Sequence, residues 1–334
     1  MVPDTPVMIS SSPGLVTVRD LRIRIAGIDV VDGVSLSASE GRILAIVGES
    51  GCGKSLTALA MLQLLPKAAR IVGGRIHLAG DDLTAMDEQQ LRAIRGDRAS
   101  IIFQEPIASL NPLMRVGAQV EEALTIHRGL SGPQARQTAI AMLAQVGIPD
   151  PEMRANQFPF ELSGGMCQRI MIAAALVCRP RLLIADEPTT ALDVTIQAQI
   201  LELMKRLRDE VGTTIVIITH DMGVVADMAD DVAVMYGGRV IESGPVEGIF
   251  AQPAHPYTRL LLATVPRLDG TRKARLRTID GNVPSADAWP QGCRFRDRCP
   301  LASEQCQNRP ALAAQAQPNH MVACWHSDRV AEIA

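Results

Sequence analysis

Two short segments of this chain have the residue types and spacing needed to bind a phosphate group and to activate water against it. Residues 48–55 match the pattern G-x-x-x-x-G-K-[ST] in full. In such a loop the backbone N–H groups surround phosphate oxygens, the lysine (Lys54) reaches the terminal phosphates, and the next hydroxyl (Ser55) coordinates Mg²⁺. The apolar run 182–185 ends in Asp186 and Glu187, which suit metal binding and general-base catalysis respectively.

The phosphate-binding interpretation depends on the elements around residues 48–55. Residues 42–47 are a compact apolar run, typical of a buried strand, and residues 55–65 are rich in helix formers up to Pro66. A strand, a glycine-rich loop and a helix in this order are the context that a phosphate-binding loop requires. We therefore expect nucleotide binding by these residues: Gly48, Glu49, Ser50, Gly51, Cys52, Gly53, Lys54, Ser55, Thr57 and Asp186.

A third segment suggests a further anion contact. It consists of Leu162, Ser163, Gly164, Gly165 and Met166, followed by an apolar run over 170–178. Two neighbouring glycines let the backbone approach an anion closely, and the N-terminal end of a helix directs partial positive charge at it. The alternative is a Ser-Gly-Gly turn that opens an ordinary helix.

Strand-like and helix-like segments alternate along most of the chain. We expect strands at 16–25, 31–38, 71–78, 99–103, 181–185 and 213–219, helices at 87–94, 163–179 and 194–211, and mostly helical structure over 113–147. This alternation favours an α/β fold with a largely parallel sheet. Periodicity weakens near residue 265, so we expect a small, loop-rich extension over 266–334 and a flexible leader over 1–14.

Net charge and the lengths of the apolar runs argue against a nucleic-acid-binding protein and against membrane-spanning segments. The 334 residues are 47% hydrophobic and 21% charged, with a net charge of −3, so the overall charge does not favour nucleic acid as a partner. The basic excess over 264–300 is interpreted as a solvated face. Apolar runs such as 170–178 are much shorter than the roughly 18–20 residues of a membrane span.

With every motif in order, residues 15–265 resemble the nucleotide-binding subunit of an ATP-binding-cassette (ABC) transporter. The resemblance implies a P-loop NTPase fold with a RecA-like parallel sheet, an antiparallel β subdomain and a helical subdomain at about 105–178. It implies ATP hydrolysis with Glu187, His220 and Gln104 as catalytic residues. Mg²⁺ is then held by Ser55, Gln104 and Asp186, and Asp193 belongs to the D-loop. Ser163 and Gly165 of the signature close over ATP held by a second subunit.

Three further segments resemble the oligopeptide/dipeptide importer branch: Gln104–Pro112, His255–Leu261 and the C-terminal cysteines. This branch implies ATP-driven import of peptides, or of related cargoes such as nickel complexes or glutathione. Its partners are a second ATPase, with a heterodimer favoured, two transmembrane permease subunits and, indirectly, a periplasmic peptide-binding protein. The location is peripheral, on the cytoplasmic face of a bacterial inner membrane. The alternatives are a soluble ABC ATPase in DNA repair or translation and a nucleotide-binding regulatory module.

Four cysteines lie within the last 42 residues: Cys293, Cys299, Cys306 and Cys324. Four thiolates suffice for Zn²⁺ or an iron–sulfur cluster, and the spacing alone leaves metal, cluster and free thiols open. The resemblance favours a structural [4Fe–4S] cluster, with zinc as the alternative.

The chain departs from the family pattern at two places. No Phe, Tyr or Trp precedes Phe103, so no aromatic residue from that region can stack on adenine; Ile25, near the expected position, offers only an aliphatic surface. We therefore expect weak selection among nucleotide bases. Cys167 replaces the basic residue that is common after Met166 in this branch, with little expected effect.

Overall fold

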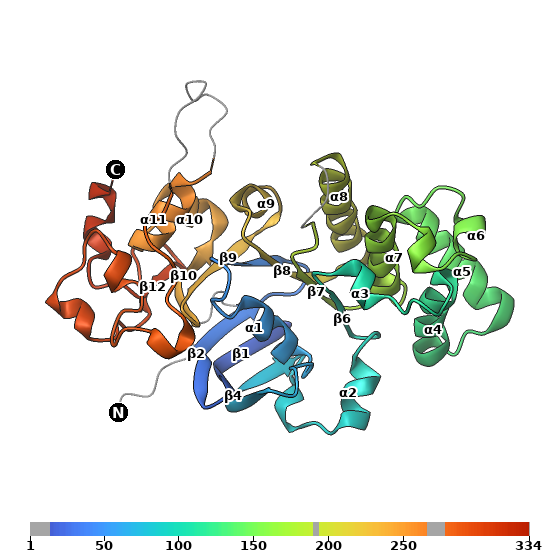
Figure 1. Ribbon diagram of the computed structural model, residues 1–334, viewed down its shortest axis with the longest axis horizontal. Coiled ribbons are helices and arrows are strands. Elements are labelled where there is room, and N and C mark those ends of the chain that lie inside the picture. Colours follow the sequence, from blue (N-terminus) through green and yellow to red (C-terminus); the bar gives the residue numbers. More distant parts are fainter. Residues whose placement is uncertain (1–13, 190–193, 266–277, 334) are drawn as a thin grey trace. The chain divides into compact units, whose positions relative to one another are not determined.

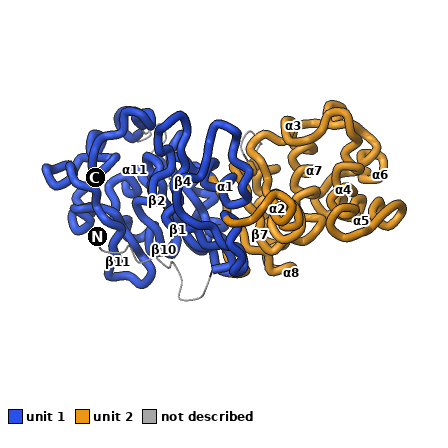
Figure 2. Tube along the Cα trace, turned by 90° about the horizontal axis from the view of Figure 1, so that it is seen from below, with its two compact units in different colours: residues 1–39, 43–84, 219–334 blue, residues 40–42, 85–218 orange. Residues whose placement is uncertain are grey.

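The computed structural model describes residues 14–189, 194–265 and 278–333 (Figure 1). The chain forms two compact units (Figure 2): unit 1 contains residues 1–39, 43–84 and 219–334, and unit 2 contains residues 40–42 and 85–218. The flexible leader was expected over 1–14, and all of it except Gly14 lies outside the described residues.

Unit 1 contains an antiparallel sheet with the strand order β2-β1-β4-β5. Its strands are β1 (Val16–Ile25), β2 (Ile28–Ala38), β4 (Ala69–Leu78) and β5 (Asp81–Asp82). Val16 lies opposite Ala38 of β2 and Leu78 of β4. Ala26 and Gly27 both have positive φ, as the two central residues of a tight β-hairpin turn require.

Unit 1 also contains the strand that leads into the phosphate-binding pattern. This strand, β3 (Ile43–Val47), is buried throughout and runs parallel to β9 (Asp231–Tyr236). Antiparallel pairing continues from β9 to β10 (Arg239–Pro245), then to β12 (Met321–Val322) and β11 (Ala313–Ala314). The C-terminal extension thus adds two short strands to the edge of β10.

The α-helices of unit 1 are short. They are α1 (Lys54–Met61), α9 (Met222–Met228), α10 (Val246–Ala251) and α11 (Pro256–Ala263). The helix that we expected over 55–65 ends earlier, because Gln63 adopts a left-handed φ of 54°. The described part of the extension is built from 3-10 turns at Ala286–Ala288, Arg296–Arg298, Glu304–Gln307 and Ser327–Glu332.

Unit 2 has a parallel sheet of β8 (Thr214–Thr219), β7 (Leu182–Asp186) and β6 (Ala99–Ile102), with β7 in the middle. β7 and β8 are buried along their whole length, as expected for a parallel sheet covered on both faces. The helices are α2 (Glu88–Ile94), α3 (Pro106–Ser109), α4 (Val116–Arg128), α5 (Gly132–Gln145), α6 (Pro151–Arg154), α7 (Gly164–Leu176) and α8 (Val194–Val211).

The predicted strands at 16–25 and 99–103 and the amphipathic helix at 194–211 are confirmed within one residue. A membrane-crossing helix would need more length and more apolar residues than any helix in the described ranges has.

Candidate functional site

The loop between β3 and α1 has a shape that only glycine allows at its first position. Gly48 has a φ of 150°, and a Cβ there would lie 2.2 Å from the carbonyl oxygen of Met235. Gly51 and Gly53 also have positive φ, and Gly53 caps α1 in the left-handed conformation. This backbone presents consecutive N–H groups at the N-terminal end of a helix, which is an anion-binding arrangement.

Lys54 lies inside this loop. Its Nζ donates hydrogen bonds to the carbonyl oxygens of Gly48 (2.7 Å) and Glu49 (3.0 Å), and the residue is only 6% exposed. Thr57 donates from both its N–H and its hydroxyl to the Gly53 carbonyl, 2.9 Å in each case. The loop backbone therefore orients the lysine, and two hydrogen bonds from Thr57 join the first turn of α1 to the Gly53 carbonyl of the loop.

Two residues far along the chain hold the loop at Glu49. The Glu49 N–H donates to the Tyr257 hydroxyl (2.9 Å), and the Glu49 carboxylate forms a bidentate ion pair with Arg298 at 2.7 and 3.1 Å. The Arg298 side chain is 6% exposed. A forked pair of this kind fixes geometry as well as charge. The extension thus contacts the phosphate loop directly.

Tyr257 is positioned by the His255-Pro256-Tyr257 segment at the start of α11. The Nδ1 atom of His255 accepts a hydrogen bond from the Tyr257 N–H at 3.0 Å. Burial lowers the pKa of His255 to about 3, so the imidazole stays neutral and serves as a helix cap. Tyr257, Tyr236 and Phe295 pack together with ring centroids 4.9–5.4 Å apart.

The acidic pair of unit 2 lies at the end of β7. Asp186 is 6% exposed, whereas Glu187 is partly exposed and has a left-handed φ of 47°. Its N–H donates to the Ile218 carbonyl (2.9 Å), and its Oε2 accepts a hydrogen bond from the Gln104 amide (2.9 Å). A left-handed non-glycine residue costs free energy and is found preferentially at functional sites. The structure thus brings the expected Gln104 and Glu187 together.

The signature segment opens α7 and faces solvent. The Ser163 Oγ caps the helix by accepting from the Met166 N–H at 3.3 Å, and both Ser163 and Gly164 are exposed. A Cβ on Gly164 would meet no atom within 4 Å. Cys167 is buried, and its thiol donates to the Pro159 carbonyl at 3.4 Å. The thiol at this departure from the family pattern therefore points inward, away from the exposed Ser163.

His220 is exposed, directly after β8, and Asp221 caps α9 with its carboxylate. The phosphate loop and His220 belong to unit 1, while Gln104, Asp186, Glu187 and the signature belong to unit 2. Asp193, expected in the D-loop, lies outside the described residues.

The four C-terminal cysteines gather in one loop-rich region. The Cys293 N–H donates to the Cys306 carbonyl (2.9 Å), and Cys324 follows β12. Burial raises the pKa of Cys299 to about 11 and of Cys324 to about 12, and neighbouring thiols add to both shifts. Among the described residues, however, no three His, Cys, Asp or Glu side chains are arranged to hold a metal ion.

Sequence reasoning missed Arg298 and the role of Tyr257. Pro256 is a signal for a helix start, because proline is common at the first helical position, but no sequence pattern indicates that the Tyr257 hydroxyl contacts Glu49. Arg298 stands next to Cys299 in a basic stretch that we interpreted as a solvated face. No pattern in the sequence links it to a glutamate 249 residues away.

Comparisons with known proteins agree with this arrangement of motifs. Residues 31–190 match the family model described as ABC transporter, and residues 241–306 match the model described as oligopeptide/dipeptide transporter, C-terminal region. Among solved structures, the dimer of a bacterial ABC transporter cassette aligns with a TM-score of 0.63 and 30% identity, covering 69% of this chain and 98% of the cassette.

Relatives of nearly full length are also found. A "Probable peptide ABC transporter ATP-binding protein" of Sinorhizobium fredii is 49% identical over 96% of this chain and 97% of its own length. A dipeptide transport ATP-binding protein of Bacillus subtilis is 48% identical over 92% of both chains. An oligopeptide transport ATP-binding protein of Salmonella typhimurium is 47% identical over 93% of both. The chain therefore belongs to the ABC transporter ATP-binding proteins, in the oligopeptide/dipeptide branch.

Proposed function

We propose that this chain hydrolyses ATP to drive the import of peptides, as the nucleotide-binding subunit of an ABC importer. The observation that carries the proposal is a complete phosphate loop in one chain with a hydrogen-bonded Gln104–Glu187 pair. The near full-length similarity to dipeptide and oligopeptide transport ATP-binding proteins supports peptides, or a related cargo, as what is carried.

ATP binding is assigned to the loop at residues 48–55. Its N–H groups surround the β-phosphate, and Lys54 exchanges its carbonyl contacts for phosphate oxygens. Ser55, Gln104 and Asp186 would hold Mg²⁺, which would supply positive charge against the β- and γ-phosphates. Ser55 lies in the first turn of α1 and Asp186 ends β7, so both oxygens come from regular elements.

Hydrolysis is assigned to Glu187. Its carboxylate takes a proton from water as the water oxygen bonds to the γ-phosphorus, and the bond from that phosphorus to the β–γ bridging oxygen breaks to give ADP and phosphate. The Gln104 amide, 2.9 Å from Oε2, holds the carboxylate in orientation. His220 contacts the γ-phosphate from the end of β8.

Assembly follows from the exposed signature. Ser163 is exposed and Gly165 is partly exposed, and we assign both to ATP bound by a second subunit. We favour a related ATPase as this partner, giving a heterodimer. Asp193 contributes to the same interface through the D-loop.

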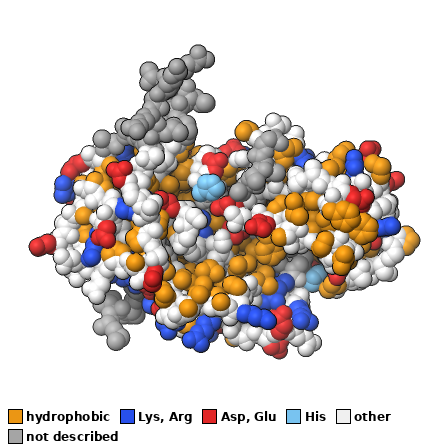
Figure 3. All heavy atoms as spheres, in the orientation of Figure 1, with side chains coloured by type: hydrophobic (Ala, Val, Ile, Leu, Met, Phe, Trp, Pro, Cys, Tyr) orange, Lys and Arg blue, Asp and Glu red, His pale blue; other side chains and the backbone are white. Residues whose placement is uncertain are grey.

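Docking on two permease subunits is assigned to the helical part of unit 2. Ile107 is 64% exposed and Leu113 is 85% exposed, and both follow Gln104 closely. Figure 3 shows hydrophobic side chains gathered over the helical part of this unit, toward the right of the view. The chain is then peripheral, on the cytoplasmic face of the inner membrane, and a periplasmic peptide-binding protein supplies cargo to the permeases.

A structural [4Fe–4S] cluster is assigned to Cys293, Cys299, Cys306 and Cys324. The thiols of Cys293, Cys299 and Cys306 add to the rise in the pKa of Cys324, although no three of the described side chains are arranged to hold a metal ion. Zinc needs all its ligands around one point, whereas a cluster spreads its four thiolates over separate irons. Four thiolates can hold either group, and we favour the cluster because the chain resembles peptide-importer ATPases with a C-terminal cysteine motif.

Glu187→Gln is expected to lower the ATP hydrolysis rate by at least about 100-fold while retaining ATP binding, because the amide cannot accept the proton. Steady-state hydrolysis and nucleotide binding of the purified chain check this. Glu105→Gln, an exposed acid beside Gln104, is the control and should leave the rate unchanged. Hydrolysis at the normal rate in Glu187→Gln would show that the base lies elsewhere.

Arg298→Ala is expected to weaken ATP binding about three- to tenfold, because Glu49 loses its bidentate partner and the loop loses order. Calorimetric titration with ATP measures the change. Arg296→Ala, in the same 3-10 turn but ion-paired to Asp297, should bind ATP as the unchanged chain does. Equal affinities in the two variants would contradict the anchoring role of Arg298.

Anaerobic purification is expected to yield a brown protein with about four irons per chain. Cys299→Ser should lose the iron. Cys178→Ser should retain it, because the Cys178 thiol is buried elsewhere and donates a hydrogen bond to the Ala123 carbonyl. Metal analysis and absorbance spectroscopy distinguish the cases. A colourless protein with stoichiometric zinc would rule out the cluster.

A further inference from the structure

Unit 1 contains a cavity of about 440 Å³ that the ATPase mechanism does not use. Its walls come from β1, β2 and β10 and from two segments of the extension, 293–295 and 309–312. None of the phosphate-loop residues 48–55 lines it. The volume lies within the range of small-molecule sites.

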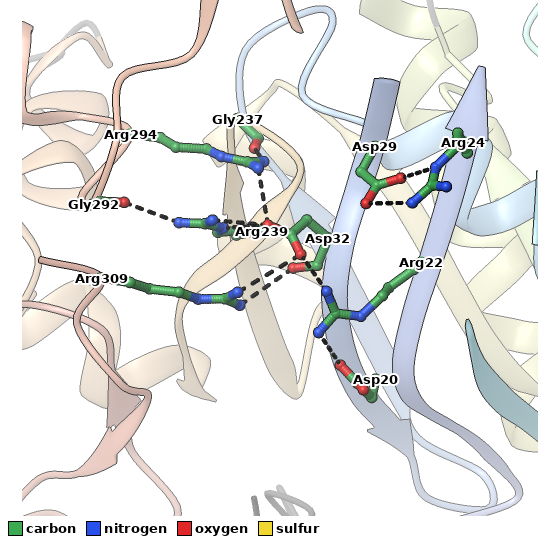
Figure 4. Close-up of polar contacts among 10 residues, drawn as sticks. All are labelled: Asp20, Arg22, Arg24, Asp29, Asp32, Gly237, Arg239, Gly292, Arg294 and Arg309. Carbon is green, nitrogen blue, oxygen red and sulfur yellow. Dashed lines mark hydrogen bonds and ion pairs between the residues drawn. The ribbon is translucent and has the colours of Figure 1, made fainter. Parts of the chain in front are cut away.

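Four arginines of the cavity wall converge on one carboxylate, that of Asp32 (Figure 4). Its Oδ1 lies 3.0 Å from Arg22 Nη1 and 3.6 Å from Arg309 Nη1. Its Oδ2 lies 2.8 Å from Arg239 Nη2 and 2.9 Å from Arg294 Nη2. The four come from β1, β10 and the extension, so the fold itself brings them together.

Asp32 is ionised in this arrangement. Its side chain is 10% exposed, and burial alone raises the pKa of a carboxyl group. The hydrogen bond from Arg239 and the positive charges of Arg239, Arg309 and Arg294 outweigh burial and hold the pKa of Asp32 below its usual value. Asp32 therefore contributes one full negative charge.

Asp32 by itself carries less charge than the four guanidinium groups around it. Asp20 adds a second carboxylate, 3.2 Å from Arg22, while the neighbouring Asp29 forms hydrogen bonds to Arg24 at 2.5 and 3.1 Å. The four guanidinium groups around Asp32 thus carry twice the charge of Asp20 and Asp32 together. Concentrating positive charge in a half-buried place is costly unless an anion accompanies it.

Two of the guanidinium groups are fixed in orientation by backbone carbonyls. Arg239 Nη1 donates to the Gly292 carbonyl at 3.0 Å, and Arg294 Nη1 donates to the Gly237 carbonyl. Arg294 also stacks on the Trp289 ring, 3.8 Å from its centroid. The donors are therefore preorganised, which reduces the entropy that a ligand must lose on binding.

Besides these four arginines the wall contains Arg19, Asp20 and Ser35, and the remainder is largely apolar. It includes Val240, Ile241, Phe295, Pro310 and Leu312. Arginine forks match the planar or tetrahedral oxygens of carboxylates and phosphates, and the apolar wall matches a hydrocarbon or ring. The cavity thus combines an anion-binding side with an apolar side.

We propose that this cavity is a binding site for a small organic anion that carries one carboxylate or phosphate group on an apolar body. The anion sits against Arg22, Arg239, Arg294 and Arg309, and the body packs against the apolar wall. The site is distinct from the ATP site, because no phosphate-loop residue lines it.

Calorimetric titration of the full chain tests the proposal, with Mg·ADP present to saturate the phosphate loop. The probes are benzoate, phenyl phosphate and the neutral benzyl alcohol. At least one of the two anions should bind, and the neutral probe should not. Binding of benzoate alone or of phenyl phosphate alone supports the site and identifies the preferred head group.

Arg309→Gln, whose side chain is 46% exposed, should weaken the binding of that anion about tenfold or more. Arg22→Gln provides a second variant if the first fails to fold. Arg329→Ala, an exposed extension arginine paired with Glu332, is the matched control and should bind normally. The proposal is overturned if neither anion binds, if benzyl alcohol binds equally well, or if both glutamine variants bind like the unchanged chain.

Discussion

At Gly48 the backbone between β3 and α1 runs where no side chain can be accommodated, and the contacts of the phosphate loop with the rest of unit 1 depend on that constraint. A Cβ on Gly48 would collide with the Met235 carbonyl of β9, so strand and loop pack backbone to backbone. Behind the loop, the Gly238 N–H donates to the Cys52 carbonyl at 3.1 Å, and the Asp32 N–H donates to the Gly238 carbonyl at 2.9 Å. The turn between β9 and β10 therefore links the phosphate loop to the antiparallel sheet.

The C-terminal extension reinforces the same loop and has few regular elements of its own. Arg298 holds Glu49, Phe295 packs on Tyr236 and Tyr257, and β12 pairs with β10. The His320 imidazole lies 2.7 Å from Glu242, a buried carboxylate that also accepts from the N–H groups of Ala254 and His255. These contacts with the rest of unit 1 stabilise a segment that has little secondary structure. Through Arg298 the segment in turn stabilises the phosphate loop.

Much of the fold follows from local patterns. Alternation of apolar residues gives β1, the amphipathic period gives α8, and the phosphate-loop pattern is strong enough to be recognised alone. The strands β9 and β10 were not predicted, although the buried run 231–236 followed by Gly237 and Gly238 is a hairpin signal.

The contacts that could not be predicted are those between distant residues. Glu49 and Arg298 are 249 positions apart, and Asp32 and Arg294 are 262 apart. Each of these residues, taken alone, is a charged residue of the kind that is common on solvated protein surfaces. Only the folded chain places four arginines around one aspartate, because packing of the extension against β1 and β10 determines which charges meet.

Hydrogen–deuterium exchange of the full chain, with and without Mg·ATP, tests the central claim most directly. The claim is that the loop at 48–55 binds the nucleotide and is held in shape by the extension. Mg·ATP should slow exchange at the amides of residues 49–55 and also at residues 294–299, which are linked to the loop through Arg298 and Phe295. Unchanged exchange in the loop would contradict the nucleotide site, and protection confined to the loop would contradict its coupling to the extension.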